Sequence, residues 1–152
     1  MKDPEQAPPK LLFLCAGNSC RSQMAEGWAR YLLAGRVEAH SAGIAPSRVH
    51  PDAIAAMAQA GVDISNQRSK HVDEVERLHF DLVVTLCDDA TEPCPVFPGK
   101  VRQIHKAFKD PAGIEGTREE VMAAFRNVRD EIRAFIETLP DLLDDQPSKE
   151  RA

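Results

Sequence analysis

Short apolar runs recur along the chain and predict the strands of a sheet. Residues 11–14 are continuously apolar and precede a Gly-containing turn, as expected of a strand buried on both faces. Residues 80–87 give the clearest strand, because they contain β-branched residues and are too few for a stable helix. Residues 37–42 and 101–105 are expected to form two further strands, the latter short.

Apolar residues at helical spacing lie between and after these runs. One helix is expected from Ser22 onward, and a second over residues 51–60, with a proline in its first turn. A weaker helical pattern covers residues 72–78. The longest pattern covers residues 121–139, and we expect Pro140 to end that helix because proline cannot continue the hydrogen-bond ladder.

The alternation of strands and helices predicts an α/β fold with a mainly parallel sheet. We expect a three-layer sandwich in which a central four-stranded parallel sheet is flanked by helices. Residues 10–140 are expected to form a single catalytic domain, with flexible termini at residues 1–9 and 141–152. Residues 88–99, rich in proline and acids, are expected to be a long mobile loop.

Composition and net charge disfavour some classes of function. The chain has 152 residues with 43% hydrophobic residues, which suits one compact domain. Its net charge of −5 argues against nucleic acid and anionic membranes as partners, since both require a basic surface. With neither an apolar leader nor a membrane span in the sequence, we expect a cytoplasmic monomer, in which cysteines serve chemistry more often than structure.

One segment carries a candidate nucleophile and an anion site. A thiol follows the first strand, and an arginine six residues later begins a helix, so the turn can gather N–H groups, a helix N-terminus and a guanidinium around a tetrahedral oxyanion. This positive field favours the thiolate form of the cysteine. The expected oxyanion-binding residues after Cys15 are Ala16, Gly17, Asn18, Ser19, Cys20, Arg21 and Ser22.

The same residues have a plainer interpretation. Cys15 can be an unreactive thiol packed in a strand-turn-helix corner beside an incidental arginine. A zinc site is disfavoured, because the spacings within residues 15–20 and 87–94 depart from the usual paired-cysteine pattern. We therefore expect no metal and no cofactor.

Residues 12–27, Leu-Phe-Leu-Cys-Ala-Gly-Asn-Ser-Cys-Arg-Ser-Gln-Met-Ala-Glu-Gly, resemble the signature of the low-molecular-weight tyrosine phosphatase fold. The Gln-Met-Ala-Glu-Gly part is similar to the thioredoxin-coupled arsenate reductases. The resemblance continues nearly to Leu139. Its other segments are residues 41–43, 63–66, 81–87, 110–113 and 128–132.

The resemblance implies a reaction and roles for its residues. Cys15 would attack arsenate, Cys87 would attack Cys15 to release arsenite, and Cys94 would attack Cys87. Thioredoxin would reduce the resulting Cys87–Cys94 disulfide. Asp110, held extended by the proline that follows it, would be the general acid. Cys20 has no required role and is interpreted as packing.

Asn18, Glu26 and Ser41 match positions that help to bind potassium in some members of that family. The fourth such position holds Lys70 instead of an acid, so we expect a fixed ammonium to replace the ion and potassium dependence to be absent.

Two other functions stay open. A low-molecular-weight protein tyrosine phosphatase would use the same loop on phosphate esters, although Ala112 stands where such phosphatases usually carry a tyrosine. A non-catalytic oxyanion-binding or redox-sensing protein would bind the anion without turnover.

Overall fold

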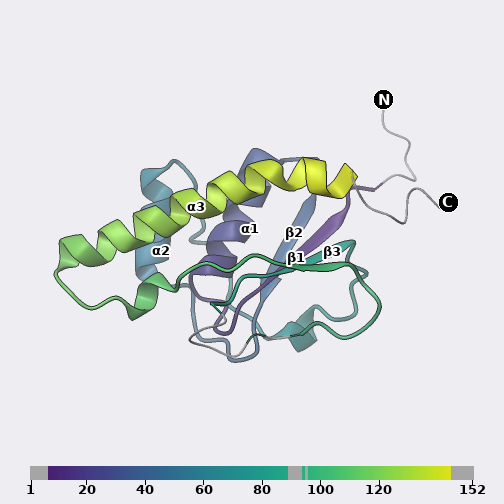
Figure 1. The fold of residues 1–152 in the computed structure, drawn as a ribbon, viewed down its shortest axis with the longest axis horizontal. Helices are drawn as coiled ribbons and strands as arrows, with labels where there is room; N and C mark the ends of the chain where they lie inside the picture. The colour runs from purple at the N-terminus through teal and green to yellow at the C-terminus, as the bar shows by residue number, and fades with distance from the viewer. Residues whose placement is uncertain (1–6, 89–93, 95, 145–152) are drawn as a thin grey trace.

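The computed structural model describes residues 7–88, 94 and 96–144, and its core is one parallel sheet. The strands are β1 (Lys10–Leu14), β2 (Glu38–Ala42), β3 (Leu82–Thr85) and β4 (Gln103–His105). They lie in the order β2-β1-β3-β4, and every neighbouring pair is parallel (Figure 1). The chain passes from β1 to β2 on one side and then returns to β3 on the other, so the strand order reverses at β1 and β3.

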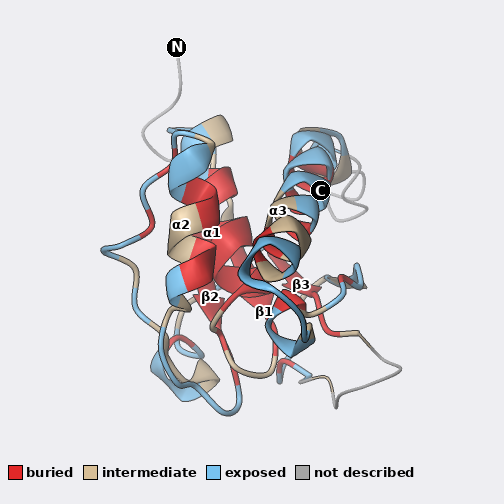
Figure 2. Ribbon diagram, turned by 90° about the vertical axis from the view of Figure 1, so that its left-hand side faces the viewer, coloured by how far each residue is buried: buried red, intermediate tan, exposed pale blue. Residues whose placement is uncertain are grey.

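Helices α1 (Arg21–Leu32), α2 (Pro51–Gln59) and α3 (Arg118–Asp144) lie together on one face of the sheet (Figures 1 and 2). The opposite face is covered by a thinner layer that includes the 3₁₀ turn η1 (Val72–Glu74). The expected α/β fold is confirmed, and the weak helical pattern at residues 72–78 forms only that short turn. A second 3₁₀ turn, η2 (Pro111–Gly113), precedes α3.

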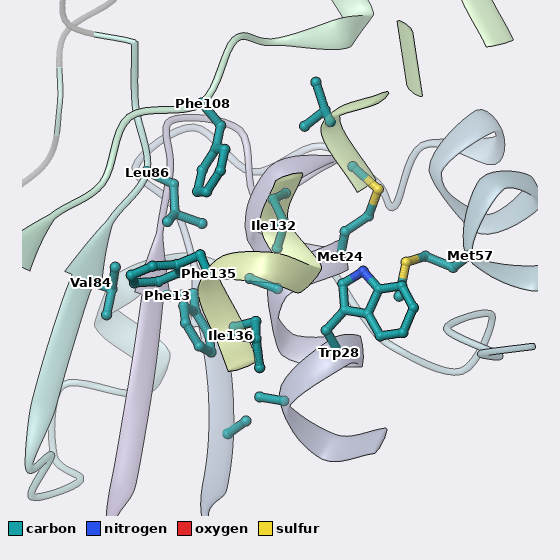
Figure 3. Close-up of a cluster of buried hydrophobic side chains, with 14 of the residues drawn as sticks. Phe13, Met24, Trp28, Met57, Val84, Leu86, Phe108, Ile132, Phe135 and Ile136 are labelled. Atoms are coloured by element: carbon teal, nitrogen blue, oxygen red, sulfur yellow. The ribbon is translucent and has the colours of Figure 1, made fainter. Parts of the chain in front are cut away.

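Alternate residues of β1 divide the core into two clusters, as the period of a strand requires. Leu11 and Phe13 face the helices, whereas Leu12 and Leu14 face the layer that contains η1. On the helical side, Figure 3 shows the indole of Trp28, the chain's one tryptophan, between Met24 and Met57. The side chains of residues 11–14 are all fully buried, which explains why this part of β1 is apolar without alternation.

The strand expected over residues 80–87 is shorter in the structure. Asp81 lies before β3, where its side-chain Oδ2 accepts a hydrogen bond from the Lys10 amide at 2.8 Å. Cys87 lies beyond the end of β3. Of the expected mobile loop at residues 88–99, residues 89–93 and 95 lie outside the described residues, as do residues 1–6 and 145–152 of the expected flexible termini.

The expectation that Pro140 ends the last helix is wrong. Helix α3 continues through Pro140 to Asp144. The proline removes one helical hydrogen bond, but the continued helix buries Leu143 beside Leu139 in the core. In addition, Arg102 donates from Nη1 to the carbonyl of Leu142 at 2.7 Å, which occupies an acceptor near the helix end.

We predict that Leu143→Ala lowers the free energy of unfolding by about 2 kcal/mol, because it removes a buried side chain from the core. The exposed Asp141→Ala is the matched control and should stay within about 0.5 kcal/mol of the parent. Urea unfolding followed by Trp28 fluorescence measures both. Equal values for the two variants would mean that the turn after Pro140 contributes no packing.

Candidate functional site

Two cysteines follow the two strands at which the sheet order reverses. Leu14 pairs with Thr85, and the Leu86 amide donates to the carbonyl of Leu14 at 2.8 Å, so Cys15 and Cys87 follow neighbouring strand ends. Both side chains are buried, at 2% and 0% exposure. In open α/β sheets this reversal point, at the carboxyl ends of the strands, is the usual ligand-binding position.

The loop between β1 and α1, residues 15–20, turns its carbonyl groups outward. Each carbonyl from Ala16 to Cys20 accepts a hydrogen bond from the surrounding protein. The donors are the amides of Ile44 (3.0 Å) and Ala45 (2.9 Å) for Ala16, Ser69 Oγ (3.2 Å) for Gly17, Gln23 Nε2 (3.2 Å) for Asn18, the His50 amide (3.0 Å) for Ser19 and the Met24 amide (2.9 Å) for Cys20.

The outward carbonyls fix the direction of the loop N–H groups, because in a trans peptide the N–H points opposite to the carbonyl. These N–H groups therefore turn inward. No cis peptide occurs in the described part of the chain. The residues after four of these outward carbonyls line a cavity of about 50 Å³. Its walls are Cys15, Gly17, Ser19, Cys20, Arg21, Asp110 and Ala112. Loop amides, the N-terminus of α1 and a guanidinium thus surround a space next to a thiol, and such an arrangement of positive groups suits an anion.

Hydrogen bonds hold the sulfur of Cys15 from one side. Cys15 Sγ lies 2.9 Å from Ser22 Oγ, and Asn18 Nδ2 donates to that oxygen at 2.8 Å. Asn18 is fully buried and has a φ of 48°, the only positive φ of a non-glycine residue in the described ranges. Asparagine tolerates this left-handed conformation better than most residues, so its side chain and its backbone both serve the turn.

Gly43 allows the end of β2 to lie directly against the loop. A Cβ at this position would approach the carbonyl oxygens of Ala16 and Cys15 to 2.6 and 2.7 Å, and the amide nitrogen of Asn18 to 3.0 Å. These atoms are backbone and cannot move aside without moving the loop. Only glycine fits here.

Arg21 begins α1 and is held by the segment that leads to η2. Its Nη1 donates to the carbonyl of Phe108 at 3.1 Å, and its Nη2 lies 3.7 Å from Asp110 Oδ2. Asp110 also caps η2 by accepting from the Ala112 amide at 3.0 Å. The arginine is buried and Asp110 is partly exposed, so the structure brings the expected cation and the expected general acid together at the cavity wall.

Cys20 lines the same cavity as Cys15, but the environment of its thiol is different. Burial, and after it the charge of Asp110, raises the pKa of the Cys20 thiol to about 12. Cys20 therefore stays protonated at neutral pH. This agrees with its interpretation as a packing residue.

The remaining two cysteines are not in the cavity wall. Cys87 is buried beyond β3, and Cys94 is half-buried after the undescribed residues 89–93. None of the four cysteines is in a disulfide. The structure thus places Cys15 and Cys87 at adjacent strand ends.

The expected cation-site residues lie around the buried carboxylate of Glu26. Ser41 Oγ donates to Glu26 Oε1 at 2.6 Å, and Arg30 Nη2 lies 2.8 Å from Oε2. Burial lowers the pKa of Lys70, and the attraction of Glu26 opposes that shift. Two cationic side chains therefore already act on this carboxylate. The backbone amide of Lys70 also donates to Asn18 Oδ1 at 2.9 Å.

Several residues that hold the loop carried no signal of that role in the sequence. Gln23, Gln67, Ser69 and His50 act through contacts with residues distant in the chain. Gln23 belongs to a quoted motif, but only the fold reveals its partners. Within the described ranges, no cluster of three His, Cys, Asp or Glu side chains is arranged to hold a metal ion. No helix of the described residues is long and apolar enough to cross a membrane.

Known proteins are similar to this chain in sequence and in fold. The arsenate reductase of Bacillus subtilis strain 168 is 49% identical over 132 residues, which cover 84% of this chain and 95% of that protein. A solved arsenate reductase in its phosphate-binding state matches with a TM-score of 0.70 and 36% identity, covering 89% of this chain and 98% of that one. The thioredoxin-dependent arsenate reductase of Corynebacterium glutamicum matches with a TM-score of 0.66 and 27% identity, over 91% and 63%. The family model described as low molecular weight phosphotyrosine protein phosphatase matches residues 10–149, and the chain belongs to that family.

Proposed function

We propose that this chain is an arsenate reductase that forms a Cys15–arsenate adduct and draws the electrons for the reduction from thioredoxin through Cys94 and Cys87. The observation that carries the proposal is a buried thiol beside an anion cavity, with a second thiol after the neighbouring strand end. The arsenate reductases at 49% and 36% identity support the substrate, and the thioredoxin-dependent neighbour supports the reductant.

The first step forms a bond between sulfur and arsenic. The Cys15 thiolate attacks the arsenic of bound arsenate, the bond from arsenic to one hydroxyl group breaks, and that hydroxyl leaves as water with the proton that Asp110 supplies. Arg21 and the loop N–H groups balance the charge of the remaining oxygens. The position of Asp110 in the cavity wall suits a proton donor at the leaving oxygen.

The next steps reduce arsenic by two electrons. The Cys87 thiolate attacks the sulfur of Cys15, the electron pair of the S–As bond stays on arsenic, and arsenite leaves with a Cys15–Cys87 disulfide behind. The Cys94 thiolate then attacks the sulfur of Cys87, which returns Cys15 as a thiolate. A dithiol of thioredoxin reduces the Cys87–Cys94 disulfide. Because Cys87 is fully buried, this relay requires the segment after β3 to move.

A tyrosine phosphatase is the alternative, because the family and the anion loop both suit phosphate esters. Ala112, and no tyrosine, lines the cavity beside Asp110, so an aryl ring would lose a stacking partner there. We favour arsenate reduction and expect weak hydrolysis of phosphate esters. The thiol relay needs a reducing compartment, which agrees with a cytoplasmic monomer.

Single cysteine variants test the relay. Cys15→Ser should abolish turnover, and Cys87→Ser should release no arsenite. Cys94→Ser should release about one equivalent of arsenite per chain and then stop, because its Cys15–Cys87 disulfide is not passed on. NADPH consumption with arsenate, thioredoxin and thioredoxin reductase measures recycling, and arsenite is measured directly.

Phosphate-ester hydrolysis serves as the control, because it needs the anion loop but not the relay. Cys94→Ser should keep this activity, and its loss would indicate a damaged loop. Recycling by Cys94→Ser at the rate of the parent would refute the relay, and turnover of phosphate esters alone would favour the phosphatase.

Cys20 should be inert to alkylation at neutral pH. With its pKa raised to about 12, the thiol is protonated below that pH and becomes a thiolate only as the pH approaches 12. Iodoacetamide labelling at pH 7.5, mapped by mass spectrometry, should modify Cys15 before Cys20. Labelling of Cys20 first would contradict the predicted order.

Potassium should not stimulate this chain, because Arg30 and Lys70 already act on Glu26. We expect equal arsenate turnover and equal Tm in potassium and sodium chloride at the same ionic strength. Lys70→Asp, which exchanges one of these cations for an acid, should acquire a preference for potassium. A several-fold potassium effect on the parent would show that the side chains do not replace the ion.

A further inference from the structure

A row of side-chain hydrogen bonds leads from the surface to the sulfur of Cys15. Gln67 Nε2 donates to Gln23 Oε1 at 2.8 Å, and Gln23 Nε2 donates to Asn18 Oδ1 at 3.0 Å. Asn18 Nδ2 donates to Ser22 Oγ at 2.8 Å, and Ser22 Oγ lies 2.9 Å from Cys15 Sγ. Gln67 is half-buried, whereas Gln23, Asn18 and Ser22 are fully buried.

The direction of the row is set by backbone groups that can act in only one way. Gln67 Nε2 also contacts the carbonyl of Gln23 at 3.0 Å, and a carbonyl can only accept. Gln23 Nε2 contacts the carbonyls of Asn18 and Arg68 at 3.2 and 3.1 Å, which fixes the second amide in the same manner. Asn18 Oδ1 faces the amide of Lys70, which can only donate. All three amides therefore have their N–H₂ groups on the side nearer to Cys15.

The direction of these hydrogen bonds determines whether Ser22 acts as donor or acceptor toward the sulfur. A thiolate has no proton, so the hydrogen bond between Ser22 and a Cys15 thiolate must come from the hydroxyl. The Ser22 oxygen meanwhile accepts from Asn18, which polarises its O–H group further. Consecutive donors of one polarity in a buried environment strengthen one another, and here they end at the atom that carries the negative charge.

We propose that Gln23 and Gln67 are positioning residues that stabilise the thiolate of Cys15 through Asn18 and Ser22. They contact neither the sulfur nor the anion cavity, and they act by fixing the Asn18 side chain and aligning the dipoles behind Ser22. The inference rests on the proposed function only in taking Cys15 as the nucleophile. It holds for attack on arsenic and for attack on phosphorus alike.

The test measures how readily Cys15 forms a thiolate without using arsenate. In a Cys87→Ser/Cys94→Ser background, the rate of iodoacetamide alkylation of Cys15 is recorded against pH. Gln23→Met and Gln67→Met remove the amides with little change in volume. The exposed Gln59→Met, outside the row, is the matched control. The groups in the cavity that titrate or carry charge, Arg21, Asp110 and Cys20, are unchanged in every variant.

We expect Gln23→Met to lower the alkylation rate at neutral pH by about tenfold and to move the pH profile upward, because Asn18 loses the donor that aligns its side chain behind Ser22. Gln67→Met, one step farther away, should give a smaller change of the same sign, about threefold. Gln59→Met should match the background. The maximal rate at high pH should be at least as high in Gln23→Met and Gln67→Met as in the background, because a less stabilised thiolate is the stronger nucleophile.

A purely structural role would lower the urea midpoint of Gln23→Met and leave its pH profile in place. That result, or equal profiles for Gln67→Met and Gln59→Met, would overturn the proposal. If Gln23→Met does not fold, Gln67→Met decides the question, because its side chain is only half-buried. A shifted profile in a chain that does not reduce arsenate would uphold this inference and refute the proposed function.

Discussion

The constraint on which the site depends is that one short loop must turn its carbonyl groups away from its centre. A buried carbonyl without a donor costs about as much as a lost hydrogen bond, so this conformation exists only where donors surround it. The segment of residues 44–50, Ser69 and the first turn of α1 supply those donors. Gly43 is needed for the same reason, because the absence of a side chain there lets the end of β2 lie close to the loop. Several segments far apart in the sequence therefore serve to hold the five carbonyl groups from Ala16 to Cys20.

Local arrangement, and not overall charge, determines the chemistry of this site. The chain carries a net charge of −5, yet the cavity is lined by Arg21 and by loop residues whose N–H groups turn inward. Two thiols five residues apart show how sharply the environment changes. Cys15 contacts the hydroxyl of Ser22, whereas Cys20 is buried near the Asp110 carboxylate and holds its proton. Net charge therefore says little about the substrate of a small enzyme, because a few oriented dipoles outweigh distant charges.

The strands and the anion loop were predictable because their signals are local. Four apolar residues in a row describe β1, and the spacing of Cys15 and Arg21 describes a turn that leads into a helix. The end of α3 was not predictable from Pro140, since the burial of Leu143 outweighs the missing hydrogen bond. Gln23 could not be assigned a role from sequence, because its partner Gln67 lies 44 residues away. Contacts of that range exist only once the chain has folded.

The order of synthesis determines when this loop can take its folded conformation. Residues 15–20 are synthesised before residues 44–50 and 67–70, whose donors hold the loop carbonyls. Until those later segments dock, the loop has no reason to keep its conformation, and Cys15 is an ordinary thiol in a flexible chain. The surroundings of Cys15 are thus completed only as the domain closes. A nascent or misfolded chain therefore lacks both the contact between Ser22 and Cys15 and the cavity beside that thiol, and the two form together with the fold.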